Sequence, residues 1–524
     1  SVLWLRSALR VRDNDALQQA LEAGGDGLLI LYVWRFGRVP KTPAQVFECA
    51  AVGALQRELA ARGSSLQTCI ATTDEQAVST VAEAAAAVCA STVIIDASGL
   101  DGSALPPGLE TALVALGCRA SVQVVVKHAL LLPMYRSEHA TGRTKEGSKQ
   151  LRWANWLRIA SEYKIEPPIS APRRLPPPPL PMLIGPAAPL PDPTSAGEWA
   201  KRVLSLWGQV SEDEAACRAR AVAVPRNERA MDLGETARAL ASVDADGSAM
   251  DPSAGLVVAS RVSPYLRFGV LSAREAYHLG VRKRHLLWRD WSHLCWRYSE
   301  SLRHGDPVVA VLDGCTRRVP ASPQPAHATS VRAIRPAWAD DDEAAFAAWT
   351  TGTTGAPIVD AAMRQLWATG WMSRRARLLC ASCLVEGMSA DWRRGRDWFA
   401  HTLIDHDPAI NECMWQNAGM CGLDPFYRGL LWEAEVDEAA LSPQDVESYL
   451  NLELRWPSNL RHTAVQPRPP IEQVAAMAVE RREWLRRNVF SKAGKVSRVG
   501  VRVNKASGRV MGLGRSVACE AAGP

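Results

Sequence analysis

The chain has 524 residues, which is more than one ordinary hydrophobic core accommodates and predicts two domains. Its composition, 47% hydrophobic and 22% charged, is that of a globular protein, and no apolar run reaches the roughly 18 residues that span a bilayer. The net charge of +6 is compatible with a polyanionic partner such as DNA, but so mild an excess does not require one.

The twelve cysteines are scattered along the chain. Cys380 and Cys383 form a C-x-x-C inside a helical run with no second pair at metal spacing, so we interpret them as small core residues. This usage favours a reducing compartment. Because the chain begins at Ser1, any targeting segment would already be missing, and the compartment is not predicted.

Residues 1–130 alternate between β-rich and helical runs, which predicts a doubly wound parallel α/β domain. No G-x-G-x-x-G follows the first strand, and Gly142–Lys149 places Ser before Lys, the reverse of a P-loop, so nucleotide binding in this half is unsupported. The expected strands are Val2–Leu5, Leu28–Val33, Thr92–Asp96 and Ser121–Val126, and the expected helices are Asp15–Ala23, Ala44–Ala61 and Glu75–Cys89.

Residues 131–196 are predicted to be a proline-rich interdomain linker. Its clearest part, Glu166–Pro193, carries a run of two and a run of four prolines that favour extended polyproline conformations and prevent helix. A semi-rigid connector is our interpretation, and an SH3-type ligand is the alternative.

Residues 197–488 contain long helical patterns and no strand pattern, which predicts an all-α domain. Residues 489–524 are predicted to be a basic tail, solvated and partly disordered, that would add sequence-independent affinity for phosphate backbones. The expected helices are Arg274–Arg282, His285–Arg303, Glu343–Trp349, Ile358–Thr369, Arg374–Glu386, Arg394–Leu403 and Glu472–Arg487.

The stretch Ile404–Gly422 organises this second half. Asp407 followed by Pro408 predicts a helix start, because a carboxylate caps free N–H groups and proline tolerates the first helical position. Asp407, Asn411 and Trp415 then share one helix face. Taken alone, this window is also compatible with a capped helix that buries one tryptophan.

Five stretches together resemble the photolyase/cryptochrome family. TGTTGAPIVDAAMRQLWATGWM, ADWRRG and IDHDPAINECMWQN are similar to the FAD-binding core of that family, SRVSPYLRFG to its phosphate-binding turn, and VLWLRSALRVRDNDAL to its opening strand and loop. The resemblance covers residues 2–485, most strongly 260–425. It implies an α/β domain followed by an all-α domain that binds FAD.

The resemblance implies a set of FAD ligands. Ser260 and Ser263, three residues apart ahead of a helical run, would contact the diphosphate, with Val262 contributing backbone; helix capping is the alternative. The family's Thr before this Ser is Ala259 here, so one hydroxyl contact is lost. Arg297 would contact the flavin.

Four further residues match positions around the flavin ring and the adenine. Arg377 and Asp405 correspond to the pair beneath the isoalloxazine ring, where an Arg fixes negative flavin charge. Asp407 corresponds to the residue that reaches the adenine side, and Asn411 to the residue facing flavin N5. Asn at that position is typical of photolyases and favours fully reduced flavin.

Three tryptophans match the family's electron path: Trp415 nearest the flavin, Trp392 in the middle and Trp338 outermost. Any single Trp is more often a packing residue. Nineteen of the 34 aromatic residues are tryptophan; most are expected to be packing residues, but the excess makes a chain of indoles worth looking for.

The lesion pocket departs from the family. Trp296 matches the stacking Trp, but the family's Glu is His293 and its second stacking Trp is Asn417. The His-Asn pair is replaced by Ser373 and Arg374, and the six-four photolyase histidines by Arg374 and Leu378. Arg374 would bind backbone phosphate or be an ordinary solvated helix charge.

Three functions follow from the resemblance. The first is a blue-light photoreceptor or repurposed flavoprotein, with DNA or a protein signalling partner. The second is a DNA photolyase for cyclobutane dimers in which His293 replaces the usual acid. The third is a structural subunit that keeps the fold. An antenna pigment, folate or deazaflavin, is not supported, because VIIDASGLDGSALPPG and KHALLLPM lack the usual polar contacts.

Overall fold

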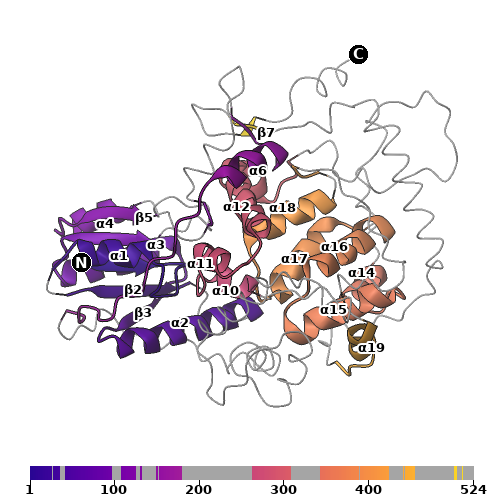
Figure 1. Ribbon diagram of the computed structural model, residues 1–524, viewed down its shortest axis with the longest axis horizontal. Helices are drawn as coiled ribbons and strands as arrows, with labels where there is room; N and C mark the ends of the chain where they lie inside the picture. Colours follow the sequence, from indigo (N-terminus) through magenta and orange to yellow (C-terminus); the bar gives the residue numbers. More distant parts are fainter. Residues whose placement is uncertain are drawn as a thin grey trace.

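The computed structural model describes a set of segments that covers both halves of the chain. Figure 1 shows an α/β part, in indigo and purple, beside a group of helices in rose and orange. In the described segments no helix is long and apolar enough to cross a membrane. The described residues are 1–25, 27–35, 42–96, 108–125, 130–132, 149–151, 153–179, 262–308, 343–388, 390–419, 421–423, 441, 443–454, 501–503 and 510–511.

A five-stranded parallel sheet with the order β3-β2-β1-β4-β5 forms the centre of the α/β part, as predicted. Every residue of β1, β2 and β4 is buried, which explains the apolar runs of β1 and β2 and the apolar centre of β4. The strand β3, LQTCI, was not predicted, because its polar residues interrupt the run. The strands are β1 (Val2–Leu5), β2 (Leu29–Trp34), β3 (Leu66–Ile70), β4 (Thr92–Asp96) and β5 (Ser121–Val125).

The crossover helices begin at clear caps. Asn14, Thr42 and Thr73 each accept a backbone N–H of the first turn that follows, so they fix where these helices start. The helices are α1 (Asp15–Glu22), α2 (Pro43–Ala61), α3 (Asp74–Ala87) and α4 (Leu109–Ala115), the last of which was not predicted.

The switch point of this sheet lies between β1 and β4, where doubly wound folds usually bind ligands. Here the carboxylate of Asp96 occupies it. Asp96 is fully buried, and its Oδ2 accepts the backbone N–H groups of Ser7 at 2.8 Å and Ala8 at 2.7 Å. The backbone donors at this point are therefore satisfied by the protein's own acid.

The second half is helical, as predicted, although two helices are shorter than expected. The first ends at His278, because Gly280 adopts a φ of 105°. The second breaks at Ser299, whose extended backbone caps a new helix. The elements are α10 (Ser263–Arg267), α11 (Ala273–His278), α12 (Lys283–Tyr298), α13 (Glu300–His304), α14 (Glu343–Thr351), α15 (Pro357–Thr369), α16 (Arg374–Ser382), a π-helical turn η5 (Cys383–Gly387), α17 (Trp392–Thr402), α18 (Pro408–Ala418) and α19 (Pro443–Leu450).

The prediction of a plain linker over 131–196 was wrong for its first part. The helix α6 (Trp153–Glu162) lies there, because Trp156 and Ala160 bury an apolar face that packs on α12. The strand β6 (Lys149–Leu151) pairs with β7 (Val501–Val503), which pairs with β8 (Val510–Met511). Part of the predicted tail is therefore strand. The prolines beyond residue 179 and the expected helix 472–487 lie outside the described residues.

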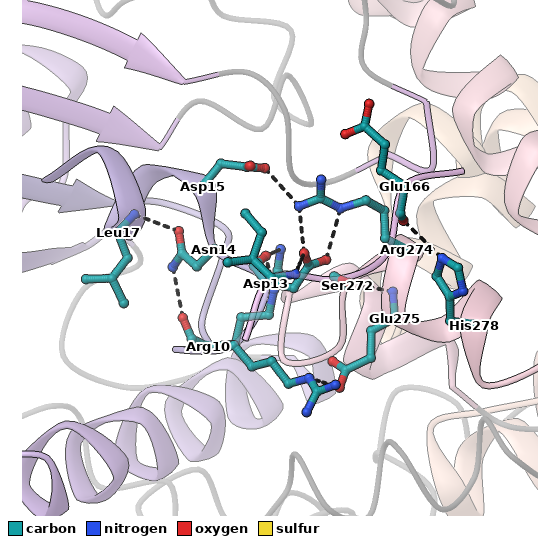
Figure 2. A network of polar contacts seen from close by, with 12 residues as sticks. Arg10, Asp13, Asn14, Asp15, Leu17, Glu166, Ser272, Arg274, Glu275 and His278 are labelled. Atoms are coloured by element: carbon teal, nitrogen blue, oxygen red, sulfur yellow. Dashed lines mark hydrogen bonds and ion pairs between the residues drawn. The ribbon is translucent and has the colours of Figure 1, made fainter. Parts of the chain in front are cut away.

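The two halves meet at a close backbone contact between Gly269 and the loop after β1. Gly269 has a φ of 67°, and a Cβ there would lie 1.8 Å from the carbonyl oxygen of Ser7. Arg10 donates from Nη1 to the Gly269 carbonyl at 2.7 Å. Arg274 on α11 binds the buried Asp13 at 2.6 Å and Asp15 at 3.0 Å (Figure 2). Only glycine fits at this contact, and ion pairs surround it.

Candidate functional site

The helix α18 carries the centre of the site. Asp407 caps it as predicted: its Oδ1 accepts the N–H groups of Ala409 at 3.1 Å and Ile410 at 3.2 Å. Pro408 occupies the first helical position. Asn411 and Trp415 follow on the same face, and all three side chains are buried. The local spacing therefore places an acid, an amide and an indole together.

His293 on α12 binds the second oxygen of that cap. Its Nε2 lies 3.0 Å from Asp407 Oδ2, and its ring is fully buried. Burial lowers the pKa of His293, so the neutral ring donates Nε2–H to an ionised carboxylate. A neutral histidine bound in this way is no acid at neutral pH. The role of His293 as a replacement for the usual acid stays a prediction.

Two buried or partly buried arginines keep Asp407 ionised. Burial opposes ionisation, but His293, Arg267 and Arg289 together hold the pKa of Asp407 well below its usual range. Arg267 donates from Nε to the His406 carbonyl at 2.8 Å, and Arg289 from Nη2 to the Leu266 carbonyl at 3.1 Å. Sequence reasoning missed both, although Arg267 lies within the motif SRVSPYLRFG.

Arg377 and Asp405 form the predicted pair. Arg377 Nη2 lies 2.7 Å from Asp405 Oδ2, and its Nε donates to the Met372 carbonyl at 3.1 Å. Asp405 is buried, and its other oxygen, Oδ1, has no partner. The pair is thus held in place on one side and has an unused acceptor on the other.

Asn411 is oriented by the neighbouring helix α17. Its Nδ2 donates to the Arg396 carbonyl at 3.0 Å. Arg396 in turn binds Glu412 Oε2 at 3.3 Å and Asp397 at 2.8 Å. This bond uses one amide hydrogen of Asn411, and neither Arg396 nor Glu412 was predicted to contribute.

Trp415 and Trp392 interlock across α17 and α18. A Cβ on Gly395 would lie 2.1 Å from Cη2 of Trp415, and one on Gly419 would lie 2.4 Å from Cδ1 of Trp392. Each indole therefore lies directly against a glycine of the other segment. Trp415 also packs edge-on against Phe399, with ring centroids 5.0 Å apart. The third predicted tryptophan, Trp338, lies outside the described residues.

The predicted phosphate-binding residues are only partly described. Val262 is buried just before α10, and Ser263 Oγ accepts the indole N–H of Trp371 at 3.2 Å. Ser260 lies outside the described residues. Arg297 is exposed in the last turn of α12, so the structure does not bring it into the buried group.

Each predicted lesion-pocket residue has its own surroundings in the structure. Trp296 is half-buried, and its Nε1 is buried without a partner. The guanidinium of Arg374 lies over the ring of Trp288, 5.3 Å from its centroid. Asn417 lies at the end of α18, where its Oδ1 is 2.4 Å from the position of a Cβ on Gly422. Asn417 therefore packs into the turn that closes the helix.

Two family models match this chain in the regions just described. Residues 1–103 match the model of DNA photolyase, and residues 284–436 match the FAD binding domain of DNA photolyase. The chain belongs to the photolyase/cryptochrome family. FAD is the cofactor of the domain that residues 284–436 match.

This photolyase/cryptochrome homologue matches known proteins in sequence over short stretches only, whereas the structural matches cover most of the chain. It is 52% identical over 90 residues to a deoxyribodipyrimidine photo-lyase of Agrobacterium fabrum, which is 17% of this chain and 19% of that protein. A class III photolyase structure from Agrobacterium tumefaciens gives a TM-score of 0.57 at 21% identity, covering 92% of this chain and 97% of that one. A cryptochrome structure from Synechocystis gives 0.54 at 20% identity, covering 86% of each.

The matched stretches span less than two fifths of the curated relatives. The residues present nevertheless fit a flavin dinucleotide. Three polar atoms around α12 and α18 are buried without a protein partner: Asp405 Oδ1, His293 Nδ1 and Trp296 Nε1. Buried polar atoms are nearly always hydrogen-bonded, so each of these two acceptors and one donor can take a partner from a polar ligand. The described residues contain no cluster of three or more acidic, histidine or cysteine side chains suited to a metal.

Proposed function

We propose that this protein is a blue-light flavoprotein in which FAD is reduced by electrons from Trp415 and Trp392. The observation that carries the proposal is that α18, with Asn411 and Trp415, contacts α16, whose Arg377 is bonded to Asp405. Bound FAD would supply blue-light absorption and one-electron chemistry. The residues that would hold it are Val262, Ser263, Arg377, Asp405, Asp407 and Asn411, with Ser260 and Arg297 added by resemblance.

Arg377 supplies a fixed positive charge. Asp405 holds the guanidinium at 2.7 Å, so the charge stays in one place when a ligand gains an electron. Asn411 supplies a polar atom of fixed orientation, because the Arg396 carbonyl holds its amide. Together they favour a reduced, negatively charged ring over an oxidised, neutral one.

Trp415 and Trp392 supply the electrons in sequence. The interlock with Gly395 and Gly419 holds both indoles against the same helix crossing, which favours transfer from Trp392 to oxidised Trp415. Arg393 lies over Trp392 at 4.6 Å from the ring centroid. As the resemblance implies, Trp338 would be the outer indole that donates an electron to oxidised Trp392.

The first test is illumination of holoprotein with blue light and an external reductant while flavin absorbance is recorded. We expect Trp415→Phe to retain bound FAD and to lose most of the photoreduction rate. The matched control is Trp367→Phe, whose indole stacks on Trp398 and belongs to no proposed electron step. Equal photoreduction in wild type and Trp415→Phe would overturn the electron path, and protein that takes up no FAD would favour a structural role.

We further propose a photoreceptor-like or repurposed role over DNA repair. The support is the state of the lesion pocket: His293 is neutral and bound to Asp407, and Asn417 packs against Gly422. Neither side chain supplies the acid or the aromatic stacking that dimer repair uses. The partner would then be a protein, with the basic C-terminal residues available for DNA.

Repair of cyclobutane pyrimidine dimers is the second candidate. The half-buried Trp296, whose indole N–H has no partner, favours it, because that ring offers a stacking surface. The test is blue-light conversion of a single-stranded oligonucleotide containing one thymine dimer by holoprotein with chemically reduced FAD. Turnover that disappears in Trp296→Ala protein would establish repair, and bound flavin without turnover would support the photoreceptor-like role.

A further inference from the structure

Four tryptophans form a compact cluster between α6 and α12, which lie side by side in Figure 1. We name Trp153, Trp156, Trp288 and Trp291 the indole cluster. Ring centroids are 4.4 Å apart for Trp153 and Trp288, 5.8 Å for Trp153 and Trp156, 5.5 Å for Trp156 and Trp291, and 6.0 Å for Trp153 and Trp291. Each indole of the cluster therefore contacts at least one other, and Trp153 contacts all three.

The geometry of the cluster favours sharing of electronic excitation. Trp153 and Trp156 are stacked with an interplanar angle of only 26°, and the Trp153–Trp288 pair is in close edge-to-face contact. Transition dipoles at contact distance couple strongly, because dipolar coupling falls with the cube of separation. Ultraviolet light absorbed by one ring of the cluster is therefore shared with the others rather than confined to it.

Two members of the cluster, Trp288 and Trp291, lie on α12, the helix that also carries His293, the partner of Asp407 at the candidate flavin site. Trp288 precedes Trp296 by eight residues of α12, a rise of about 12 Å along the helix axis. His293, which binds Asp407, stands between them on that helix. No indole of the cluster belongs to the electron path through Trp415 and Trp392, so the cluster needs a separate explanation.

We propose that the indole cluster is an ultraviolet antenna that transfers excitation to the bound FAD. Indole emission overlaps flavin absorption, so excitation energy passes from the cluster to a nearby flavin without movement of an electron. The proposal rests on FAD binding in the proposed site. It does not depend on photoreduction or on repair.

The test is the excitation spectrum of flavin fluorescence from holoprotein, recorded across the indole and flavin bands. In Trp153→Phe/Trp288→Phe protein we expect the indole contribution to fall, relative to the flavin band, by clearly more than the share of the 19 tryptophans removed, since the two most closely spaced rings are gone. The matched control is Trp367→Phe/Trp398→Phe, which removes another stacked pair, with centroids 5.9 Å apart, and leaves the cluster intact. That control should lose a much smaller share.

A second readout needs no flavin emission. Coupled indoles give a near-ultraviolet circular dichroism couplet, which should disappear in the Trp153→Phe/Trp288→Phe protein and persist in the control. If that protein fails to fold, the half-buried Trp288→Phe alone serves, with a smaller change in both spectra.

Several outcomes would overturn the antenna. An equal loss in both double variants would mean that any indole feeds the flavin, and a lost couplet with an unchanged excitation spectrum would mean that the cluster is packing. A lower rate of blue-light photoreduction in the cluster variant would identify an electron donor instead. If the wild-type protein binds FAD but is not photoreduced, the proposed function is wrong and the antenna proposal stands. If the protein does not bind FAD, both proposals are wrong.

Discussion

The imidazole of His293 donates its Nε2–H to the carboxylate of Asp407 at 3.0 Å, and this bond joins α12 to the N-cap residue of α18. Both groups are buried, and Asp407 also caps the helix that carries Asn411 and Trp415. His293, which by resemblance stands where the family has a pocket Glu, thus helps to hold α18 in place.

His293→Leu should therefore lower the free energy of unfolding. The cause would be the lost hydrogen bond to Asp407 and not the loss of a catalytic acid. Removing one donor from a buried carboxylate costs about 1–3 kcal/mol of unfolding free energy. His293→Gln, which can still donate a hydrogen bond, should lose less. Urea unfolding of holoprotein measures both. If Leu and Gln variants are equally stable, the hydrogen bond to Asp407 does not hold α18 in place.

Stability should depend on the ionisation of Asp290. Its carboxylate accepts the N–H groups of Leu131 at 3.0 Å and Leu132 at 2.8 Å, yet burial raises its pKa to about 7. The folded state then binds a proton that the unfolded chain has released, so this contribution to stability is present below about pH 4 and is lost as pH rises through 7.

The measurement is the free energy of unfolding from pH 4 to pH 8 for wild type and Asp290→Asn. The difference between the two should change with pH, by at most about 1.4 kcal/mol per pH unit. A difference that is constant over this range would show that Asp290 titrates normally.

Gly269→Ala should be among the most damaging single changes. The new Cβ would clash with the Ser7 carbonyl at 1.8 Å, which the backbone relieves only by parting the two halves of the chain. We expect a loss above about 4 kcal/mol, or no folded protein. Gly117→Ala is the control, because its φ of 70° is similar but nothing lies within 4 Å; it should cost about 1 kcal/mol. Similar losses for the two would contradict the clash.

Gly395→Ala should slow flavin photoreduction. The added methyl group would stand 2.1 Å from Trp415 Cη2 and displace the indole, and misplacing a reacting group by an ångström costs up to about a hundredfold in rate. We expect a loss of about tenfold in the photoreduction rate, with FAD retained. Gly53→Ala in α2 has only the end of Arg57 at 3.8 Å and should leave the rate unchanged. An unchanged photoreduction rate in Gly395→Ala would show that the packing of Trp415 against Gly395 does not matter for electron transfer.

Local features of the site were predictable from the sequence, and long-range ones were not. The Asp407 cap and the shared face with Asn411 depend on spacings of four residues, which the helical period fixes. The partner of that cap, His293, is 114 residues away in sequence, so no periodic pattern links them. The position of Arg377 beside Asp405 was predicted only because a family resemblance supplied it.

Predictions from composition were wrong where one residue type dominated a region. The prolines after residue 166 made residues 131–196 look like a linker throughout, whereas Trp153, Trp156 and Ala160 give α6 an apolar face. Likewise, the basic tail hid two short strands, which are stabilised by pairing with β6 rather than by any pattern of their own. Helix ends were missed at Gly280 and Ser299, where the backbone leaves the helical region.

The contact at Gly269 is part of a single apolar core shared by both halves of the chain. Phe47 of α2 packs against Tyr265 at 5.2 Å and Phe268 at 5.4 Å, and one continuous cluster includes residues from β1 to α13. The two halves are thus not interchangeable modules. A chimaera that takes either half from a relative would need to keep both the aromatic contacts of Phe47 and the glycine at position 269. Without them, each half would expose apolar surface that the native chain buries.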